Sequence, residues 1–535
     1  MNIINLANIK ILDNTINFEF FYMNKYIDDN TIIYFEDYNQ TQYTCNIKKC
    51  KNKFEFIDSK NCEIAKVNIN LEFKKYGLLK IKLKDHTGIS ELTILNNKNE
   101  KIYEYSNPYV IFYKKFKINI SKMGFDFQEK HLGDRFRYEI KKQLYGFQKY
   151  HRLFIYRFLK FRFRKYFLFN DRLLYGDDNA EQLFNYVYHN YPDFAKNCFF
   201  VLDKDSPSIN RLKKVGKVLK YGSFKHKIIF LNCKMVLSSH SSYLDNCFNP
   251  FSKIEMDIYK DLINKNFVFL QHGIVMNDVR KYLNRELTTA DLFITSTKSE
   301  YKYISSDDFM YEPQMVIPTG LPRFDKLENK TSNVILLSPT WRSYDSSIKF
   351  EDSDYYKSFK SLLTNNYLLD LLKKHKYKIK FLLHPVFSNY KYLFEPFKNA
   401  NIEILETSKI KYFELFNECK IFITDYSSIH FDVATLKKPI IYYQFDKIFF
   451  FSNHYQSGYF NYENDGFGKV VPTEQELLSD IEYYLNNDCK IREEYKQKIE
   501  NTFIHLDHEN SKRVFEEVIK LNKSNEINYR FNNVH

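Results

Sequence analysis

Several common sequence signals are missing from this 535-residue chain, and their absence narrows the possible functions. No apolar run reaches about 18 residues, so we expect no transmembrane helix. The first residues, MNIINLANIKILDN, lack the charged and apolar regions of a secretory signal. The eight cysteines include no CxxC pair, and no second pair completes a zinc site with Cys45 and Cys50, so we expect reduced thiols in the cytoplasm. Glycine and proline are scarce, at 13 and 12, which we attribute to compositional bias and not to function.

Motifs of two large classes of nucleotide-dependent enzymes are missing as well. The chain has no Walker A sequence and no GxGxxG, which disfavours a nucleotide kinase and a Rossmann dehydrogenase. No carboxylate cluster obviously suits Mg²⁺, and we predict neither a metal site nor a cofactor.

The amino-terminal part of the chain has the pattern of β-strands. Residues 1–120 alternate apolar and polar side chains in many short segments, such as INFEFFY and LLKIKLKD. This period-two pattern predicts antiparallel strands, which we interpret as a sandwich-like accessory domain.

From about residue 170 onward, apolar strands alternate with helical stretches, which is typical of an α/β fold. The expected strands are CFFVLD, MVLSS, FVFLQ and LFITS, then VILLS, KIKFLL, IEIL, KIFIT and PIIYY. The two sets are joined near residues 317–330. They predict two Rossmann-like lobes, 170–318 and 319–535, that face a cleft, and the stretch from about Thr473 is expected to be helical.

Between these regions lies a strongly basic segment, within residues 121–169 of a chain whose formal charge is +14. From residue 135 to 167, eleven cations interleaved with aromatic and aliphatic residues face a single acid, Glu139. Such a segment can lie on an anionic membrane surface, link two domains as a solvated helix, or track a nucleic-acid backbone. No nucleic-acid module accompanies it, so we expect a membrane surface or a linker and no nucleic acid. The cations are Arg135, Arg137, Lys141, Lys142, Lys149, Arg152, Arg157, Lys160, Arg162, Arg164 and Lys165.

Polar residues stand where the expected parallel strands end, and ligands of open α/β sheets bind beyond those ends. Taken singly, each of these residues has an ordinary structural explanation. Together they provide two imidazoles, two arginines and a helix start with exposed hydroxyls, which predicts an anion-handling site with a proton acceptor. The residues are His272 and Gly273, Thr340, Trp341 and Arg342, His384 and Pro385, Ser427, Ser428 and Asp432, and Arg323 between the lobes.

These motifs resemble the CDP-glycerol glycerophosphotransferase family over roughly residues 170–520. The resemblance rests on QHGI, TGLPRFD, LLSPTWRS, LLHP, ITDYSSIHFDVATLKKPIIYY and GYFNYENDGFGKVV, in that order. It implies a GT-B fold and transfer of glycerol phosphate from CDP-glycerol to a hydroxyl of a lipid-linked or growing teichoic-acid-like or capsular polymer, with release of CMP. The enzyme would be peripheral on the cytoplasmic face of the cell membrane.

The resemblance also implies a role for each residue. His272 would be the base that activates the acceptor hydroxyl, and His384 would donate a hydrogen bond to the pyrophosphate. Ser427 and Ser428 would bind phosphate oxygens. Gln271, Ile274 and Val275, which depart from the usual family pattern, are expected close to the transferred group. Donor contacts are further expected from Gly273, Arg323, Thr340, Trp341, Arg342, Pro385 and Asp432, with both arginines neutralising charge and Asp432 binding hydroxyls.

Three alternatives stay open from the sequence. The donor could be CDP-ribitol, or the protein could be a GT-B glycosyltransferase that uses a sugar nucleotide. The third alternative is a non-catalytic, membrane-docked assembly protein.

Overall fold

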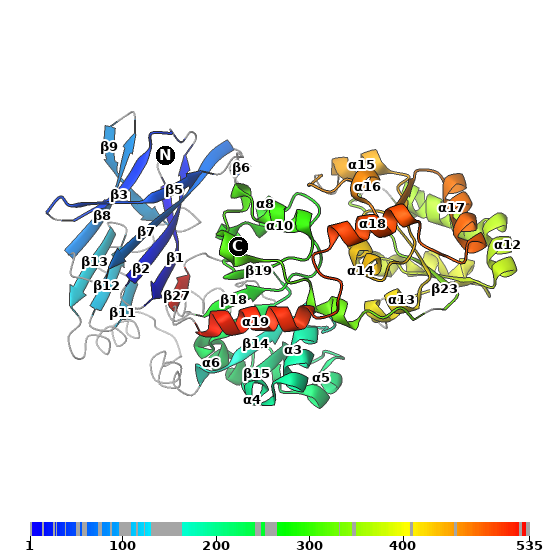
Figure 1. Ribbon diagram of the computed structural model, residues 1–535, viewed down its shortest axis with the longest axis horizontal. Helices are drawn as coiled ribbons and strands as arrows, with labels where there is room; N and C mark the ends of the chain where they lie inside the picture. Colours follow the sequence, from blue (N-terminus) through cyan, green and yellow to red (C-terminus); the bar gives the residue numbers. More distant parts are fainter. Residues whose placement is uncertain are drawn as a thin grey trace.

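The computed structural model describes residues 3–530 apart from 13–14, 25–26, 28, 38, 50–53, 56–60, 73–76, 86–87, 96–108, 114–115, 122–123, 130–162, 241–247, 252–264, 331, 345–348, 407–409, 454–456 and 524–526. Three bodies follow one another along its long axis, an amino-terminal β domain and two α/β lobes (Figure 1). Most of the basic segment, residues 130–162, lies outside the described residues.

The amino-terminal domain consists of two sheets packed face to face. One sheet has the order β10-β1-β2-β7-β5, with β6 on β7 and the carboxy-terminal strand β27 on β1, and the other has the order β11-β12-β13-β8-β3-β4, with β9 on β8. Alternate side chains of each strand enter the core, as Phe18, Phe20 and Tyr22 of β2 do. The strands are β1 (Ile3–Leu12), β2 (Thr15–Asn24), β3 (Ile32–Glu36), β4 (Gln42–Thr44), β5 (Asn46–Lys49), β6 (Phe54–Glu55), β7 (Asn61–Glu72), β8 (Gly77–Asp85), β9 (Gly88–Glu91), β10 (Thr93–Leu95), β11 (Tyr109–Tyr113), β12 (Phe116–Ser121), β13 (Gly124–Glu129) and β27 (Ile527–Arg530).

The first lobe is built on a parallel sheet of order β16-β15-β14-β17-β18-β19-β20. Its strands are short and buried on both faces, which explains their continuous apolar sequences. The strands are β14 (Phe167–Asn170), β15 (Cys198–Leu202), β16 (Val218–Lys220), β17 (Met235–Ser238), β18 (Asn266–Phe269), β19 (Leu292–Ile294) and β20 (Val316–Ile317). The helices are α3 (Asn179–Asn190), α4 (Pro192–Ala195), α5 (Ile209–Val215), α6 (Phe224–Asn232), α8 (Arg280–Leu283), α9 (Arg285–Thr288), α10 (Lys298–Ile304), and the 3₁₀ helices η3 (Asp307–Phe309) and η4 (Pro313–Met315).

The second lobe has a parallel sheet of order β23-β22-β21-β24-β25-β26. The strands are β21 (Val334–Leu337), β22 (Lys378–Phe381), β23 (Ile402–Ile404), β24 (Ile421–Thr424), β25 (Ile440–Tyr443) and β26 (Gly468–Val471). The helices are η6 (Phe350–Asp352), α11 (Asp354–Thr364), α12 (Asn366–His375), η7 (Pro385–Leu393), η8 (Glu395–Phe397), α13 (Tyr412–Glu418), α14 (His430–Thr435), α15 (Lys447–Asn453), α16 (Tyr462–Asp465), α17 (Glu474–Asn486) and α18 (Glu493–Thr502).

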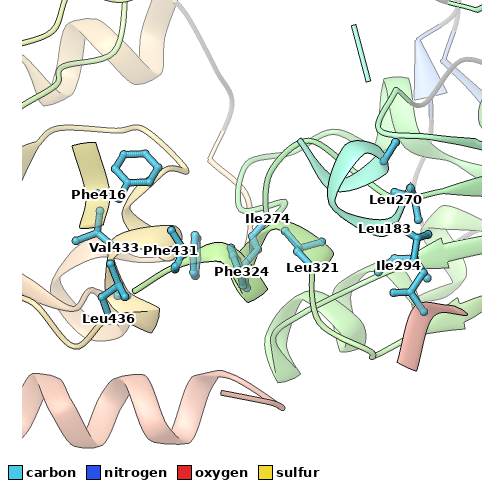
Figure 2. Packing of buried hydrophobic residues seen from close by; sticks show 14 of the residues in the cluster. Leu183, Leu270, Ile274, Ile294, Leu321, Phe324, Phe416, Phe431, Val433 and Leu436 are labelled. Atoms are coloured by element: carbon cyan, nitrogen blue, oxygen red, sulfur yellow. The ribbon is translucent and has the colours of Figure 1, made fainter. Parts of the chain in front are cut away.

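The two lobes are joined by two passages of the chain and by shared apolar packing. The chain enters the second lobe through η5 (Pro322–Lys326) and returns through α19 (Asn510–Lys523), which packs on α3 and η5 of the first lobe. Figure 2 shows one hydrophobic cluster that runs from Leu270, through Phe324 of η5, to Phe431 of α14.

The predicted GT-B architecture, two Rossmann-like lobes after an antiparallel β region, is confirmed. All nine expected strands of the lobes are present, and four further ones, β14, β16, β20 and β26, were not expected. The amino-terminal strands continue to Glu129, beyond residue 120, and the first lobe's sheet begins with Phe167. In the described part of the chain, no helix is both long and apolar enough to cross a bilayer.

Candidate functional site

Three neighbouring strands of the first lobe end in polar residues. In the order β14-β17-β18, they are followed by Arg172, by Ser239 and His240, and by His272. The His240 and His272 rings stack, with centroids 5.9 Å apart and planes 19° apart. Two imidazoles and a guanidinium therefore share the carboxyl edge of this sheet.

The His272 ring is arranged to accept a proton. Its Nδ1 lies 3.3 Å from the carbonyl oxygen of Ser239, and a proton on Nδ1 leaves the Nε2 lone pair available. The side chain is exposed, yet desolvation by the surrounding protein lowers its pKa, opposed by the charge of Asp178 and reinforced by Arg172 and Arg323. A neutral, accessible imidazole results at neutral pH.

Buried polar contacts fix the backbone just before His272. Gln271 has a φ of 63°, a left-handed conformation that a non-glycine residue seldom adopts. Its carbonyl oxygen accepts a hydrogen bond of 2.7 Å from the Asn179 side chain, and its own amide side chain donates to Glu300 at 3.1 Å. Glu300 also accepts from the Val275 N–H at 2.8 Å.

The sequence predicted that Gln271, Ile274 and Val275 lie close to the transferred group. All three side chains are buried in the first lobe, so they do not line the surface beside His272. The departures from the family pattern therefore lie in internal packing.

The second lobe presents a matching edge, formed by the loops after β22, β21 and β24. Trp341 and His384 lie side by side at 6.3 Å between ring centroids, and His384 Nδ1 accepts a hydrogen bond from the Val386 N–H at 3.3 Å. Pro385 is exposed. Thr340 is nearly buried, its N–H donates to Asp425 at 2.8 Å, and its hydroxyl has no partner among the described residues.

Ser427 and Ser428 occupy the loop after β24. Both are half-buried, and their backbone N–H groups have no acceptor in the part of the chain that the structure describes. The expected helix begins at His430, two residues later than Ser428, after a tight turn. Two hydroxyls and two backbone donors are therefore available in a single loop.

The two edges meet at Gly273. A Cβ atom on this residue would lie 3.0 Å from the Ser428 hydroxyl oxygen, so the absence of a side chain allows the close approach. Gly273, the residue after His272, and the serine loop, more than 150 residues apart in sequence, thus lie directly beside each other.

Arg323 connects the lobes through ion pairs. Its guanidinium pairs with both carboxylate oxygens of Asp432 at 2.7 Å, with Asp178 at 2.9 Å, and with the His272 carbonyl oxygen at 2.6 Å. Burial opposes the charge of Arg323, but Asp432 and Asp178 outweigh it and raise its pKa. Arg323 and Asp432 thus pair with each other. The sequence had predicted that both would contact the ligand.

Arg342 was likewise expected to contact the donor, and the structure places its side chain elsewhere. Its side chain is fully buried, pairs with Asp446 at 2.6 Å and with Asp425 at 2.8 Å, and lies 5.0 Å from the Tyr426 ring centroid. A guanidinium enclosed in this way holds the loops after β21, β24 and β25 together.

Sequence reasoning missed His240, Asp178 and Arg172. His240 directly follows the expected strand MVLSS. Its place at a strand end could therefore have identified it as a candidate site residue. Arg172 and Asp178 both follow β14, a strand that was not among the expected ones.

Two lobes with parallel sheets, one with imidazoles and the other with hydroxyls at the ends of its strands, define a fold of the GT-B type. Residues 165–520 match the family described as CDP-Glycerol:Poly(glycerophosphate) glycerophosphotransferase, and the chain belongs to this family. The family comprises alditol-phosphate transferases of teichoic acid synthesis, which confirms the resemblance identified in the sequence.

Two relatives illustrate the similarity. The minor teichoic acid biosynthesis protein GgaB of Bacillus subtilis is 31% identical over 491 residues, which cover 85% of this chain and 52% of that protein. The teichoic acid poly(glycerol phosphate) polymerase of Staphylococcus epidermidis is 23% identical, over 61% of this chain and 46% of the relative. The chain thus spans about half the length of the curated relatives it matches.

Among solved structures, the wall teichoic acid polymerase TagF with CDPG has a similar fold. The TM-score is 0.51 at 17% identity, over 74% of this chain and 99% of the TagF chain.

Proposed function

We propose that this protein transfers glycerol phosphate from CDP-glycerol to a hydroxyl of a lipid-linked or growing cell-surface polymer. The acceptor oxygen attacks the β-phosphorus, the bond between that phosphorus and the bridging oxygen of CMP breaks, and His272 Nε2 takes the hydroxyl proton. The approach of Gly273 to Ser428 is the observation that carries the proposal, because it puts a proton acceptor beside a loop of free donors.

The residues of the second lobe would hold the donor. The hydroxyls and N–H groups of Ser427 and Ser428 would bind phosphate oxygens, and His384 would donate a hydrogen bond to the pyrophosphate. Trp341, Thr340 and Pro385 would line the same edge. Arg323, Asp432 and Arg342 would position this machinery through their ion pairs, in place of the direct ligand contacts expected from the sequence.

The donor alditol is the open choice. Relatives include a teichoic acid poly(ribitol-phosphate) polymerase of Bacillus spizizenii, 24% identical over 42% of this chain and 37% of that protein. CDP-ribitol is therefore the second candidate donor. A sugar nucleotide is the third, since the GT-B fold also serves glycosyltransferases.

The place of action would be the cytoplasmic face of the cell membrane. The basic aromatic segment from residue 135 to 167, most of which lies outside the described residues, supports a peripheral contact with anionic lipids.

The direct test is CMP release by the purified protein from CDP-glycerol and from CDP-ribitol, each with and without a membrane acceptor. We expect acceptor-dependent CMP from one of the two donors. His272→Ala should lower turnover by about 100-fold or more, because the imidazole that takes the hydroxyl proton is removed. His189→Ala removes an exposed histidine of α3 and serves as the control with full activity. Full activity of His272→Ala would exclude it as the base.

A second test addresses the phosphate site. Replacing Ser427 and Ser428 together by alanine should raise the KM for the donor by about 10-fold or more, since two hydrogen bonds to charged oxygens are lost. The pair Ser305 and Ser306 in the first lobe, replaced in the same way, is the matched control. An unchanged donor KM would place the phosphates elsewhere.

A further inference from the structure

Arg172 differs from the two arginines that the sequence motifs emphasise. Arg323 and Arg342 are each neutralised by two carboxylates. The Arg172 side chain is exposed, and among the described residues no carboxylate or carbonyl oxygen accepts from its guanidinium. Its backbone N–H donates to the Tyr175 carbonyl oxygen at 3.1 Å.

The sheet places Arg172 at the same edge as the proposed base. Strands β14, β17 and β18 are direct neighbours, and the Ser239 N–H donates to the Asn170 carbonyl oxygen at 3.1 Å just beyond the strand ends. Neighbouring strands lie about 4.8 Å apart, so Arg172 follows a strand roughly 10 Å from the one that carries His272. His240 occupies the strand end between them.

The charge of Arg172 acts on groups from both lobes. After burial and the neighbouring His272, it is the next cause that lowers the pKa of His240 to about 4. It also lowers the pKa of His272, and it opposes the raised pKa of Tyr412 at the start of α13 in the second lobe. Its exposed side chain and its place at the carboxyl edge of the sheet put Arg172 at the same edge as His240 and His272.

The order along this edge separates the two substrates. Ser428 contacts the Gly273 position, next comes His272, then His240, and Arg172 lies farthest from the serine loop. Donor phosphates at Ser427 and Ser428 are thus on one side of the base, and Arg172 is on the other. An acceptor whose hydroxyl points to His272 extends toward Arg172.

We propose that Arg172, assisted by His240, binds a phosphodiester of the acceptor and so selects acceptors that already end in an alditol phosphate. The inference deepens the proposed function and rests on it. A guanidinium binds a phosphodiester through two parallel hydrogen bonds, and the neutral imidazole of His240 adds a further donor. The protein would then extend a chain more readily than it starts one.

Kinetics with two acceptors test the selection. One acceptor carries a phosphodiester next to its terminal alditol, and the other ends in a sugar without phosphate. For Arg172→Ala we expect the KM of the first acceptor to rise roughly 10- to 100-fold, because a charge-assisted pair of hydrogen bonds is lost. The KM of the second acceptor and the KM of the donor should stay unchanged, and Arg172→Lys should restore part of the affinity. Lys214→Ala, which removes an exposed charge on α5, is the matched control.

A binding experiment without donor separates this inference from the proposed function. Calorimetry with a synthetic glycerol phosphate trimer should show binding to the wild-type protein and at least about 10-fold weaker binding to Arg172→Ala. Equal affinities, no binding to the wild type, or a raised donor KM in Arg172→Ala would each overturn the assignment to the acceptor. Absence of CMP release by a wild-type protein that binds the trimer would instead contradict the proposed donor.

Discussion

His272 is accessible to substrate, although its surroundings disfavour the protonated ring. Desolvation lowers its pKa, the charges of Arg172 and Arg323 add to this effect, and Asp178 opposes it. The neighbouring His240 is neutral at pH 7 for the same main reason, burial. A base with these properties stays unprotonated below the pH at which an ordinary histidine gains its proton.

The pH dependence of activity follows from the lowered pKa of His272. Because the neutral ring is the active form and its pKa is lowered, we expect the acidic limb of kcat/KM to fall below the ordinary histidine pKa of about 6.5. Asp171, whose pKa burial and Asp178 raise to about 7, also titrates nearby, as does Glu300, whose pKa burial raises to about 7. The profile should therefore be measured for the wild type and for Asp171→Asn. An acidic limb above pH 6.5, or one that disappears in Asp171→Asn, would contradict the assignment of this limb to His272.

The ion pairs of η5 join elements that belong to different lobes. Arg323 lies between Asp178, the N-cap of α3, and Asp432 in α14. Both carboxylates are largely shielded from solvent, so each depends on the guanidinium for its counter-charge. The segment is held further by Asp325, which accepts from the Asn510 and Ser511 N–H groups at 3.0 and 2.7 Å.

Removing Arg323 should therefore be costly. Arg323→Ala leaves the Asp432 carboxylate buried without its partner, and we expect a loss of about 3–5 kcal/mol in the free energy of unfolding. Adding Asp432→Asn should recover part of that loss, because the uncompensated charge is gone. Lys437→Ala, which breaks the exposed pair with Glu500, should cost less than about 1 kcal/mol. Denaturant titration of the wild type, the single variants Arg323→Ala and Asp432→Asn, the double variant and Lys437→Ala measures these differences, and additive single effects would argue against direct coupling.

Elements differ in how far the sequence determines them. Runs such as VILLS and KIFIT are apolar because both sheet faces are covered, and they were predicted correctly. β16 and β20 lie at the two ends of the first lobe's sheet and were not recognised, and β27 pairs with the part of β1 that β10 leaves uncovered. The motif residues were located correctly at strand ends.

The partners of those residues could not be predicted from the sequence. Asp446 lies 104 residues from Arg342, and Asp178 lies 145 residues from Arg323. Only the fold brings them together, and this is why both arginines were expected to be free for ligand.

At the scale of the whole molecule, the amino-terminal domain is docked onto the first lobe by buried charges. Glu19 of β2 and Lys66 of β7 lie on the outer face of their sheet, opposite the core side chains. Lys66 pairs with Glu312 at 2.7 Å and with Glu19 at 3.4 Å, and Glu19 pairs with Arg285 at 3.4 Å. Burial alone would raise the pKa of Glu19, but Arg285 and Lys66 outweigh it and lower that pKa to about 2.

This network predicts how the docking responds to mutation and acid. Glu19→Gln leaves Arg285 without its carboxylate, and we expect unfolding to become easier by about 3 kcal/mol. The contribution of Glu19 to the free energy of unfolding is complete above its ordinary pKa of 4.5 and is lost as the pH falls toward 2. Glu91→Gln, which removes the exposed partner of Lys80, should have little effect. Thermal unfolding of both variants at pH 7 and pH 3 tests this. Equal behaviour of the two variants would contradict a structural role for Glu19.

The double passage of the chain between the lobes has a mechanical consequence. The two crossings run side by side, since the His508 ring lies 3.1 Å from the Phe324 carbonyl oxygen and Asn510 is bound to Asp325. Two adjacent covalent links restrict how the lobes can move relative to each other. Any opening of the lobes to admit or release substrates therefore has to bend the chain at η5 and at the start of α19, where the two crossings lie.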